Sequence, residues 1–136
     1  MKIKLDEGAY APVRAHATDA GMDLMTPVEF TIEPGQSAFI DTGVHIQLPP
    51  NTVGMLKSKS GLNAKRDVIG EGVIDEGYTG PICVKLRNLG AVPQHFAAGD
   101  KIIQLVVLPC LYVETELCDS LEESERGSGG FGSTGR

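Results

Sequence analysis

A carboxylate in a glycine-rich bend is the first candidate for chemistry in this sequence. Residues 72–80 read Gly-Val-Ile-Asp-Glu-Gly-Tyr-Thr-Gly and lie between two strand-like runs, so they predict a β-hairpin. Asp75 follows two apolar residues at the start of the bend, where its carboxylate could act as a general base toward a water molecule. The local alternative is an Asx-turn, in which the same carboxylate binds its own backbone. Tyr78, taken alone, reads as an ordinary sheet residue.

The C-terminal segment holds a second set of residue types suited to chemistry. Residues 126–136 read RGSGGFGSTGR, with five glycines in eleven positions. Glycines allow backbone amides to converge on phosphate oxygens, and Arg126 can neutralise charge on a transferring phosphoryl group. Phe131 offers a ring face to a nucleobase. This composition predicts a lid that closes over a nucleotide, and the alternative is a plain flexible tail.

Three further segments carry polar residues where a ligand could bind. Lys59 and Ser60 stand at the start of the only helical pattern, residues 60–66, where amides, a hydroxyl and an ammonium group make a phosphate cradle. The alternative there is N-capping by Ser60 beside solvated lysines. Asp23 either holds a hydrated divalent cation or ends a turn. Gln104 interrupts an apolar run, so its amide must pair with core backbone or with a ligand.

The elements that must position these residues are mostly strands. Apolar residues alternate over 44–48 and 82–88, a Pro-Gly turn at 34–35 separates two extended runs, and residues 101–108 are nearly continuously apolar. Gly and Pro contribute 17 and 8 of the 136 residues, and such an excess of turn formers favours many short strands. We therefore expect an all-β sandwich or barrel with one short helix, followed by an acidic and glycine-rich tail from residue 122.

The composition also argues against several classes of protein. A net charge of −6 disfavours binding of nucleic acid or an anionic membrane through a basic surface, but it leaves room for a small polyanion in a local pocket of amides. The three cysteines have no CxxC spacing and the three histidines are far apart, so we expect reduced thiols and no zinc site. No Walker A sequence, signal peptide or membrane span is recognisable. We expect a cytoplasmic, intracellular protein with no nucleic-acid or membrane partner.

In this order, the segments resemble the five motifs of the homotrimeric, all-β deoxyuridine triphosphate nucleotidohydrolase (dUTPase) family. The matching motifs lie around residues 20–24, 59–62, 72–80, 99–104 and 126–135. The resemblance implies a jelly-roll-like β-barrel over residues 1–121 and a flexible C-terminal lid over residues 122–136. It also implies hydrolysis of dUTP to dUMP and pyrophosphate, a reaction that limits uracil incorporation into DNA and supplies dUMP for dTMP synthesis.

The resemblance implies a role for each matching residue. Asp75 would orient and activate the water that attacks the α-phosphorus, and Arg126 would meet the γ-phosphate. Base and sugar would contact hairpin residues and one ring of the tail: Gly70, Gly72, Val73, Ile74, Tyr78 and Phe131. The phosphates would be held by residues of three motifs: Lys59, Ser60, Gly61, Gln104, Gly129, Gly130, Ser133 and Thr134. Asp23 would reach a Mg²⁺ ion on the triphosphate through a water molecule, and the sites would be shared between the subunits of a homotrimer.

Two positions depart from the family pattern. Lys59 stands where the family usually has Arg, and Gly77 where it usually has a second Asp. Gly77 mildly favours the related deoxycytidine triphosphate deaminases, but these need a carboxylate base after the hairpin, and no Glu lies between residues 77 and 94. A second alternative is a nucleotide-bound regulatory module that signals through protein contacts. The presence of both Asp75 and Arg126 favours an enzyme over such a module.

Overall fold

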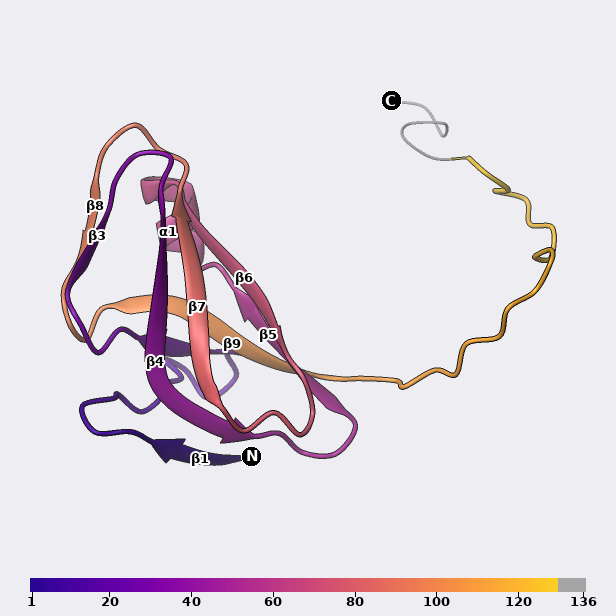
Figure 1. The fold of residues 1–136 in the computed structure, drawn as a ribbon, viewed down its shortest axis with the longest axis horizontal. Coiled ribbons are helices and arrows are strands. Elements are labelled where there is room, and N and C mark those ends of the chain that lie inside the picture. Colours follow the sequence, from indigo (N-terminus) through magenta and orange to yellow (C-terminus); the bar gives the residue numbers. More distant parts are fainter. Residues whose placement is uncertain (130–136) are drawn as a thin grey trace.

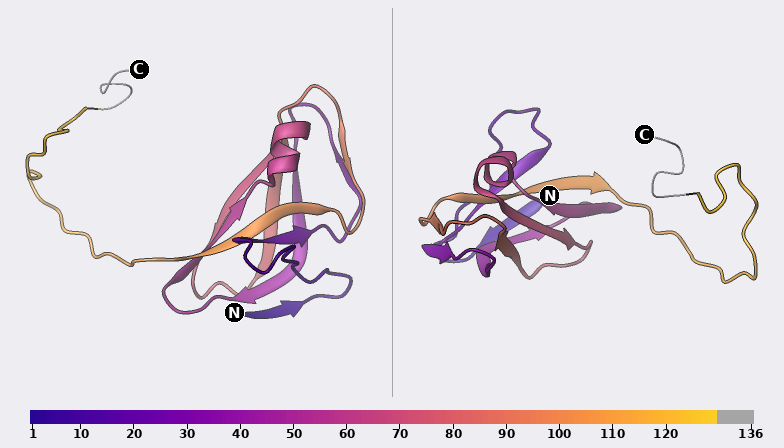
Figure 2. Two further views of the ribbon diagram at one scale, coloured as in Figure 1. Left: turned by 180° about the vertical axis from the view of Figure 1, so that it is seen from behind. Right: turned by 90° about the horizontal axis from the view of Figure 1, so that it is seen from above.

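The computed structural model describes residues 1–129 and shows a mostly β fold with one short helix (Figure 1). The strands are β1 (Lys2–Leu5), β2 (Gly21–Met25), β3 (Phe30–Ile32), β4 (Ser37–Gln47), β5 (Thr52–Lys57), β6 (Val68–Ile74), β7 (Pro81–Asn88), β8 (Gln94–Phe96) and β9 (Lys101–Pro109). The helix, α1 (Ser60–Arg66), lies between β5 and β6. Seven strands form one sheet in the order β1-β4-β7-β6-β5-β9-β2, and β3 pairs with β8. The large sheet curls into a half-barrel, which confirms the expected all-β class (Figure 2).

The apolar alternation of the sequence forms the inner face of the curled sheet. In β7, Ile82, Val84 and Leu86 are buried, whereas Lys85 between them is exposed. The apolar run over residues 101–108 is buried on both faces only in its first half. Its second half is more exposed, up to Leu108, because it leads out of the barrel into the C-terminal segment (Figure 1).

The extended run from residue 37 and the alternation over residues 44–48 join in the single strand β4. A bulge between Asp41 and His45 interrupts its pairing with β7. At the bulge Gly43 has φ +65°, and a Cβ atom there would lie 2.8 Å from the Ala9 Cβ. This close approach brings the N-terminal turn against the strand, where the Asp6 N–H donates to the Gly43 carbonyl at 2.9 Å.

Helix α1 has the predicted limits but not the predicted cap. Lys59 is the N-cap residue, with an extended backbone (φ −71°, ψ 132°) and a carbonyl that accepts from the Asn63 N–H at 2.9 Å. Ser60 is therefore the first helical residue, and the interpretation of Ser60 as N-cap is wrong. A lysine side chain has no acceptor atom, so no side chain caps the helix.

The other end of α1 is fixed by Arg66, although no residue of the helix is fully buried. The Arg66 guanidinium donates to Gln94 Oε1 at 2.6 Å and to the His95 carbonyl at 2.7 Å. It also lies 4.4 Å from the ring centroid of Phe96, which stacks on Phe30. One side chain thus docks the helix on the β3–β8 pair.

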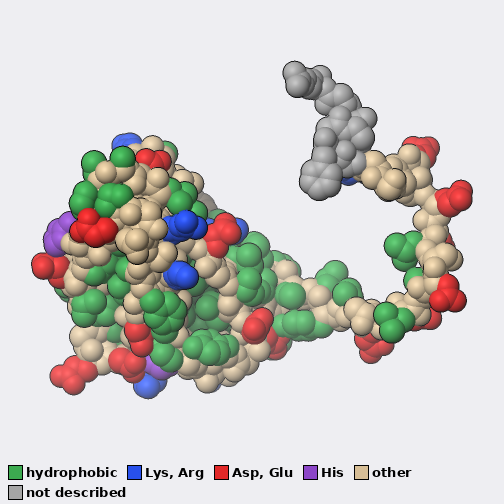
Figure 3. All heavy atoms as spheres, turned by 45° about the horizontal axis from the view of Figure 1, so that its top comes forward, with side chains coloured by type: hydrophobic (Ala, Val, Ile, Leu, Met, Phe, Trp, Pro, Cys, Tyr) green, Lys and Arg blue, Asp and Glu red, His purple; other side chains and the backbone are tan. Residues whose placement is uncertain are grey.

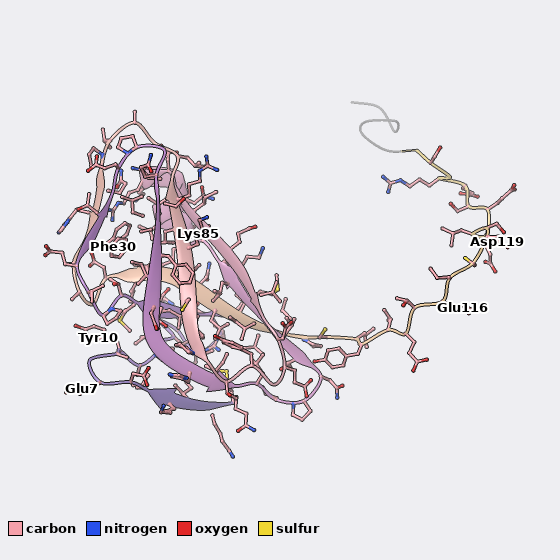
Figure 4. All side chains as sticks on the ribbon, in the orientation of Figure 1. Glu7, Tyr10, Phe30, Lys85, Glu116 and Asp119 are labelled. Carbon is pink, nitrogen blue, oxygen red and sulfur yellow. The ribbon has the colours of Figure 1, made fainter. Side chains whose placement is uncertain are left out.

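After β9 the chain leaves the barrel. Residues 110–129 contain no helix or strand and extend away from the body (Figure 3), and Glu116 and Asp119 lie on this extended part (Figure 4). The predicted domain limit at residue 121 falls inside this segment and stays a prediction. Within residues 1–129, no helix is long and apolar enough to cross a membrane.

Candidate active site

The hairpin predicted over residues 72–80 is present, and its two strands separate toward the bend. β6 and β7 pair only from Val68 opposite Asn88 to Gly70 opposite Leu86. Beyond this point β6 pairs with β5 and β7 pairs with β4, so the facing edges diverge. The open fork holds a cavity of about 300 Å³, lined by Val73, Ile74, Asp75, Tyr78, Pro81 and Cys83. Backbone groups along such a fork can bind the edge of a planar ligand.

The base of the fork is tightly packed around Gly70. A Cβ atom at Gly70 would lie 2.9 Å from Leu86 Cδ2, and one at Gly72 would lie 3.0 Å from Leu56 Cδ1. The Ser58 hydroxyl accepts from the Gly70 N–H at 2.9 Å and donates to the Gly70 carbonyl at 3.0 Å. Ser58 thus fixes the point where the two strands part.

We expect Ser58→Ala to lower the free energy of unfolding by about 1–3 kcal/mol, because it leaves two half-buried backbone groups of Gly70 without their partner. Urea unfolding of the variant and the unchanged protein gives this difference directly. Ser37→Ala, at an exposed position, is the matched control. Equal losses in the two variants would contradict the assigned role of Ser58.

The Asp75 carboxylate accepts no hydrogen bond from residues 1–129, so the Asx-turn alternative is not formed. The bend closes instead through the backbone, with the Tyr78 N–H donating to the Asp75 carbonyl at 3.1 Å. Gly77 has φ +89°, a conformation that favours glycine. The Tyr78 hydroxyl donates to the Pro81 carbonyl at 3.0 Å, which holds the ring against its own hairpin. Within the described part of the chain, the Asp75 side chain is therefore available to a ligand in the cavity.

Glu76, the next residue, has a structural role that the sequence did not reveal. Its Oε2 accepts from the Asn51 N–H at 2.8 Å and from the Tyr112 hydroxyl at 2.5 Å. The hydrogen bond to this carboxylate raises the pKa of Tyr112 to about 12. The contact ties the bend to the β4–β5 turn and to the start of the C-terminal segment. Asp75, Glu76 and Tyr112 also line a neighbouring open cavity of about 570 Å³.

A second group of predicted residues meets where β2 and β5 flank β9. Asp23 and Lys57 both pair with Gln104 across the sheet, which places Lys59 nearby. Asp23, Lys59 and Gln104 line a cavity of about 320 Å³. The Gln104 amide donates to the Ser58 carbonyl at 3.1 Å, so it pairs with backbone while facing the cavity.

The first turn of α1 lies next to these residues. Ser60 and Gly61 are exposed there and follow Lys59 directly. The first amides of a helix have no carbonyl partner within the helix, so those of Ser60 and Gly61 remain available to an anion.

Asp23 lies between two ammonium groups. The Lys59 Nζ contacts one carboxylate oxygen, and the Lys101 Nζ lies 2.9 Å from the other. Burial alone would raise the pKa of Asp23, but the hydrogen bonds and charges of Lys59 and Lys101 outweigh it and hold this pKa below its ordinary value. Asp19 also lines this cavity, so the two lysines balance two carboxylates, and Lys59 is the lysine among the lining residues that can meet a phosphate. Lys101 was not predicted from the sequence. The one feature that could have pointed to it is its position three residues before Gln104.

These residues do not build a resident metal site. Within residues 1–129, no group of three His, Cys, Asp or Glu side chains could hold a metal ion. Both oxygens of Asp23 already bind ammonium groups, so its remaining lone pairs suit a hydrogen bond from metal-bound water better than direct ligation. Asp23 could therefore meet a hydrated cation through one of its waters, but these residues do not supply a coordination shell of their own.

One chain does not bring all the predicted residues together. No residue of the described part lines both the fork cavity and the Asp23 cavity, and α1 and the hairpin bend lie at opposite ends of the barrel (Figure 1). Arg126 and Gly129 lie on the extended segment, where the Arg126 Nε donates to the Gly129 carbonyl at 3.0 Å. The predicted contacts of Gly130, Phe131, Ser133 and Thr134 lie outside the described residues.

A curled antiparallel sheet, a carboxylate without a partner among residues 1–129 in one cavity, and a lysine beside exposed helix amides at another are features that suit a phosphorylated ligand. Comparison with known proteins identifies the class, because the sequence model of the dUTPase family matches residues 7–135. The chain belongs to the dUTPase family, and the resemblance seen in the sequence is confirmed. The deoxyuridine 5'-triphosphate nucleotidohydrolase of Clostridium tetani is 44% identical and covers 100% of this chain and 97% of its own.

Solved structures agree with this assignment. The dUTPase of Staphylococcus bacteriophage 80alpha, in complex with dUpNHpp, has a TM-score of 0.92 and 30% identity, over 99% of this chain and 98% of its own. It is described as controlling transfer of virulence genes by a G protein-like mechanism. A mutant dUTPase from Staphylococcus aureus phage phi11 is described with a structural Mg(II) ion. It has a TM-score of 0.83 and 27% identity, and the match covers 90% of this chain and 98% of the phage chain.

Proposed function

We propose that this chain hydrolyses dUTP to dUMP and pyrophosphate, with Asp75 activating the attacking water. The observation that carries the proposal is the Asp75 carboxylate, which lines the open β6–β7 fork and has no hydrogen-bond partner among residues 1–129. Phosphoryl transfer needs a positioned nucleophile more than a strong base, and a carboxylate without other partners can hold a water in line with the α-phosphorus. Membership of the dUTPase family supports the same reaction.

The fork is the proposed site for the base and sugar. Val73 and Ile74 line the fork, and their backbone would present donors and acceptors to the uracil edge. Gly70 and Gly72 would shape the base of the fork, where the Gly70 N–H and carbonyl are bound to Ser58. Cytosine would leave some of these groups unpaired and is rejected for that reason. Tyr78, held by its bond to the Pro81 carbonyl, packs under the deoxyribose and leaves no room for a 2′-hydroxyl. Phe131 of the tail stacks on the uracil.

The Asp23 cavity is the proposed site for the phosphates. Lys59, Gln104 and the amides of Ser60 and Gly61 bind phosphate oxygens there. A Mg²⁺ ion bound to the triphosphate would neutralise its charge and set the geometry of the α-phosphate. Asp23 would accept a hydrogen bond from one of its waters, with Lys101 fixing the carboxylate.

The separation of the two cavities supports a homotrimer with shared sites. We infer that the fork of one chain meets the Asp23 cavity of a second, and that residues 122–136 of a third close over the ligand through Arg126, Gly129, Gly130, Ser133 and Thr134. Leu117 is fully exposed and Leu121 nearly so, as expected for a segment that packs on a neighbouring chain. A cyclic trimer is a closed symmetry of this kind. We place the enzyme in the cytoplasm.

Chromatography of separate dUTP and dCTP incubations with Mg²⁺ tests the proposal. We expect dUMP and pyrophosphate from dUTP and no product from dCTP. Formation of dUTP from dCTP would identify a deaminase instead. Binding of dUpNHpp without turnover of either nucleotide would favour the regulatory module instead.

A further inference from the structure

His45 lies between the N-terminal turn and the bend that carries Asp75. It follows the β4 bulge, which brings Asp6 against the strand. Its Nε2 lies 2.9 Å from Asp6 Oδ2, and its Nδ1 lies 2.8 Å from the Thr79 carbonyl oxygen. The side chain is only 17% exposed, so these two contacts define the position of the ring.

Both ring nitrogens of His45 face hydrogen-bond acceptors. A neutral imidazole has one N–H and one lone pair, so it can satisfy only one of the two oxygens. The imidazolium has two N–H groups and donates to both. The arrangement of a carboxylate on one side and a carbonyl on the other therefore selects the protonated ring.

The charges around the ring favour the same state. Asp6 is the nearest, and its hydrogen bond, followed by that of Thr79, raises the pKa of His45 above its ordinary value. The same hydrogen bond lowers the pKa of Asp6. Lys4, opposite His45 on β1, opposes protonation and lies 3.4 Å from Asp6 Oδ1, and Lys2 lines the same surface cavity. From the bend, the ring receives a hydrogen-bond acceptor, the Thr79 carbonyl, and the charges that act on the ring are those of Asp6 and Lys4.

The bend has few other attachments to the barrel. Glu76 holds its first half through Asn51 and Tyr112, whereas Thr79 in its second half is held by His45. Tyr78, adjacent to Thr79, shares this half of the bend. Movement of Thr79 would shift both the sugar-packing ring and the direction of the Asp75 side chain.

We propose that His45, as an imidazolium, is a positioning residue that anchors the Asp75–Gly80 bend to the N-terminal turn in its catalytic geometry. This role rests on the proposed hydrolysis of dUTP. Because a raised pKa means that the protonated state persists above the ordinary pKa of about 6.5, the anchor is complete at lower pH. One of its two hydrogen bonds is lost as the pH rises through the pKa that His45 has in the folded protein.

The ratio of kcat/KM between unchanged protein and His45→Gln, measured from about pH 6 to about pH 10, tests this role. One glutamine amide cannot span both acceptors, so we expect about a tenfold deficit near neutral pH. The deficit should vanish at high pH, where the neutral His45 ring, like the glutamine amide, can satisfy only one of the two acceptors. A constant ratio across the range would show a merely structural role and overturn the proposal.

Two further variants and one direct measurement complete the test. In an Asp6→Asn background, the kcat/KM values of the proteins with and without His45→Gln should become equal at a lower pH. The control is His95→Gln, at an exposed histidine of β8, and its kcat/KM should equal that of the unchanged protein at every pH. Nitrogen NMR of the full chain should show both His45 ring nitrogens protonated at about pH 7. A single neutral tautomer there would contradict the inference. This spectrum does not depend on turnover, so it separates failure of the anchor from failure of the proposed hydrolysis.

Discussion

Asp75→Asn is expected to lower kcat for dUTP by about a thousandfold. An amide can still contact the water but cannot take its proton or direct a lone pair of the nucleophile to phosphorus. The carboxylate accepts no hydrogen bond from residues 1–129, so the substitution leaves no broken contact in the fold. Steady-state release of pyrophosphate measures the change.

The control for this variant is Asp67→Asn, an isosteric change at the residue that ends α1. Asp67 has φ +51°, a conformation that asparagine also adopts readily, so turnover should be unchanged. Affinity of the Asp75→Asn variant for dUpNHpp should be equal or tighter, because a negative charge near the triphosphate is removed. Appreciable turnover by Asp75→Asn would exclude Asp75 as the water-activating group.

Truncation after Glu125 is expected to reduce turnover by about a hundredfold or more while leaving the barrel folded. The last strand ends at Pro109, and residues 110–125 contribute no helix or strand, so the core does not depend on the tail beyond them. The truncation removes Arg126, the proposed γ-phosphate ligand, together with Phe131 and the tail glycines. Thermal unfolding and pyrophosphate release on the same preparations measure both effects.

Single substitutions show how much of the lost turnover is due to each residue of the tail. Arg126→Gln should reproduce a large part of the loss, whereas Arg136→Gln, the other arginine of the tail, should have little effect. Full activity of the truncated chain would refute the lid. A truncated chain that fails to fold would instead show that the domain limit near residue 121 is wrong.

Local patterns predicted the fold and the hairpin well. The limits of α1, the bend around Asp75 and the buried face of β7 follow from spacing over a few residues, which sequence periodicity reads directly. Ser60 as N-cap was wrong because the extended backbone of Lys59 already takes the cap position. The order of the segments gave the family, which the family match confirms.

The contacts that support the site could not be predicted from local patterns. Ser58 and Gly70 are 12 positions apart, and Asp6 and His45 are 39 apart. Such pairs depend on strand register and on the β4 bulge, which period-two alternation does not specify. Lys101 was missed for the same reason, since only the pairing of β2 with β9 brings it to Asp23.

The central claim is that a water oriented by Asp75 attacks the α-phosphorus of dUTP. Hydrolysis of dUTP by the full chain with Mg²⁺, in water labelled with a heavy oxygen isotope, followed by mass spectrometry of both products, tests it most directly. We predict that the label enters dUMP and is absent from pyrophosphate. Label in pyrophosphate would place the attack on the β-phosphorus and contradict the claim.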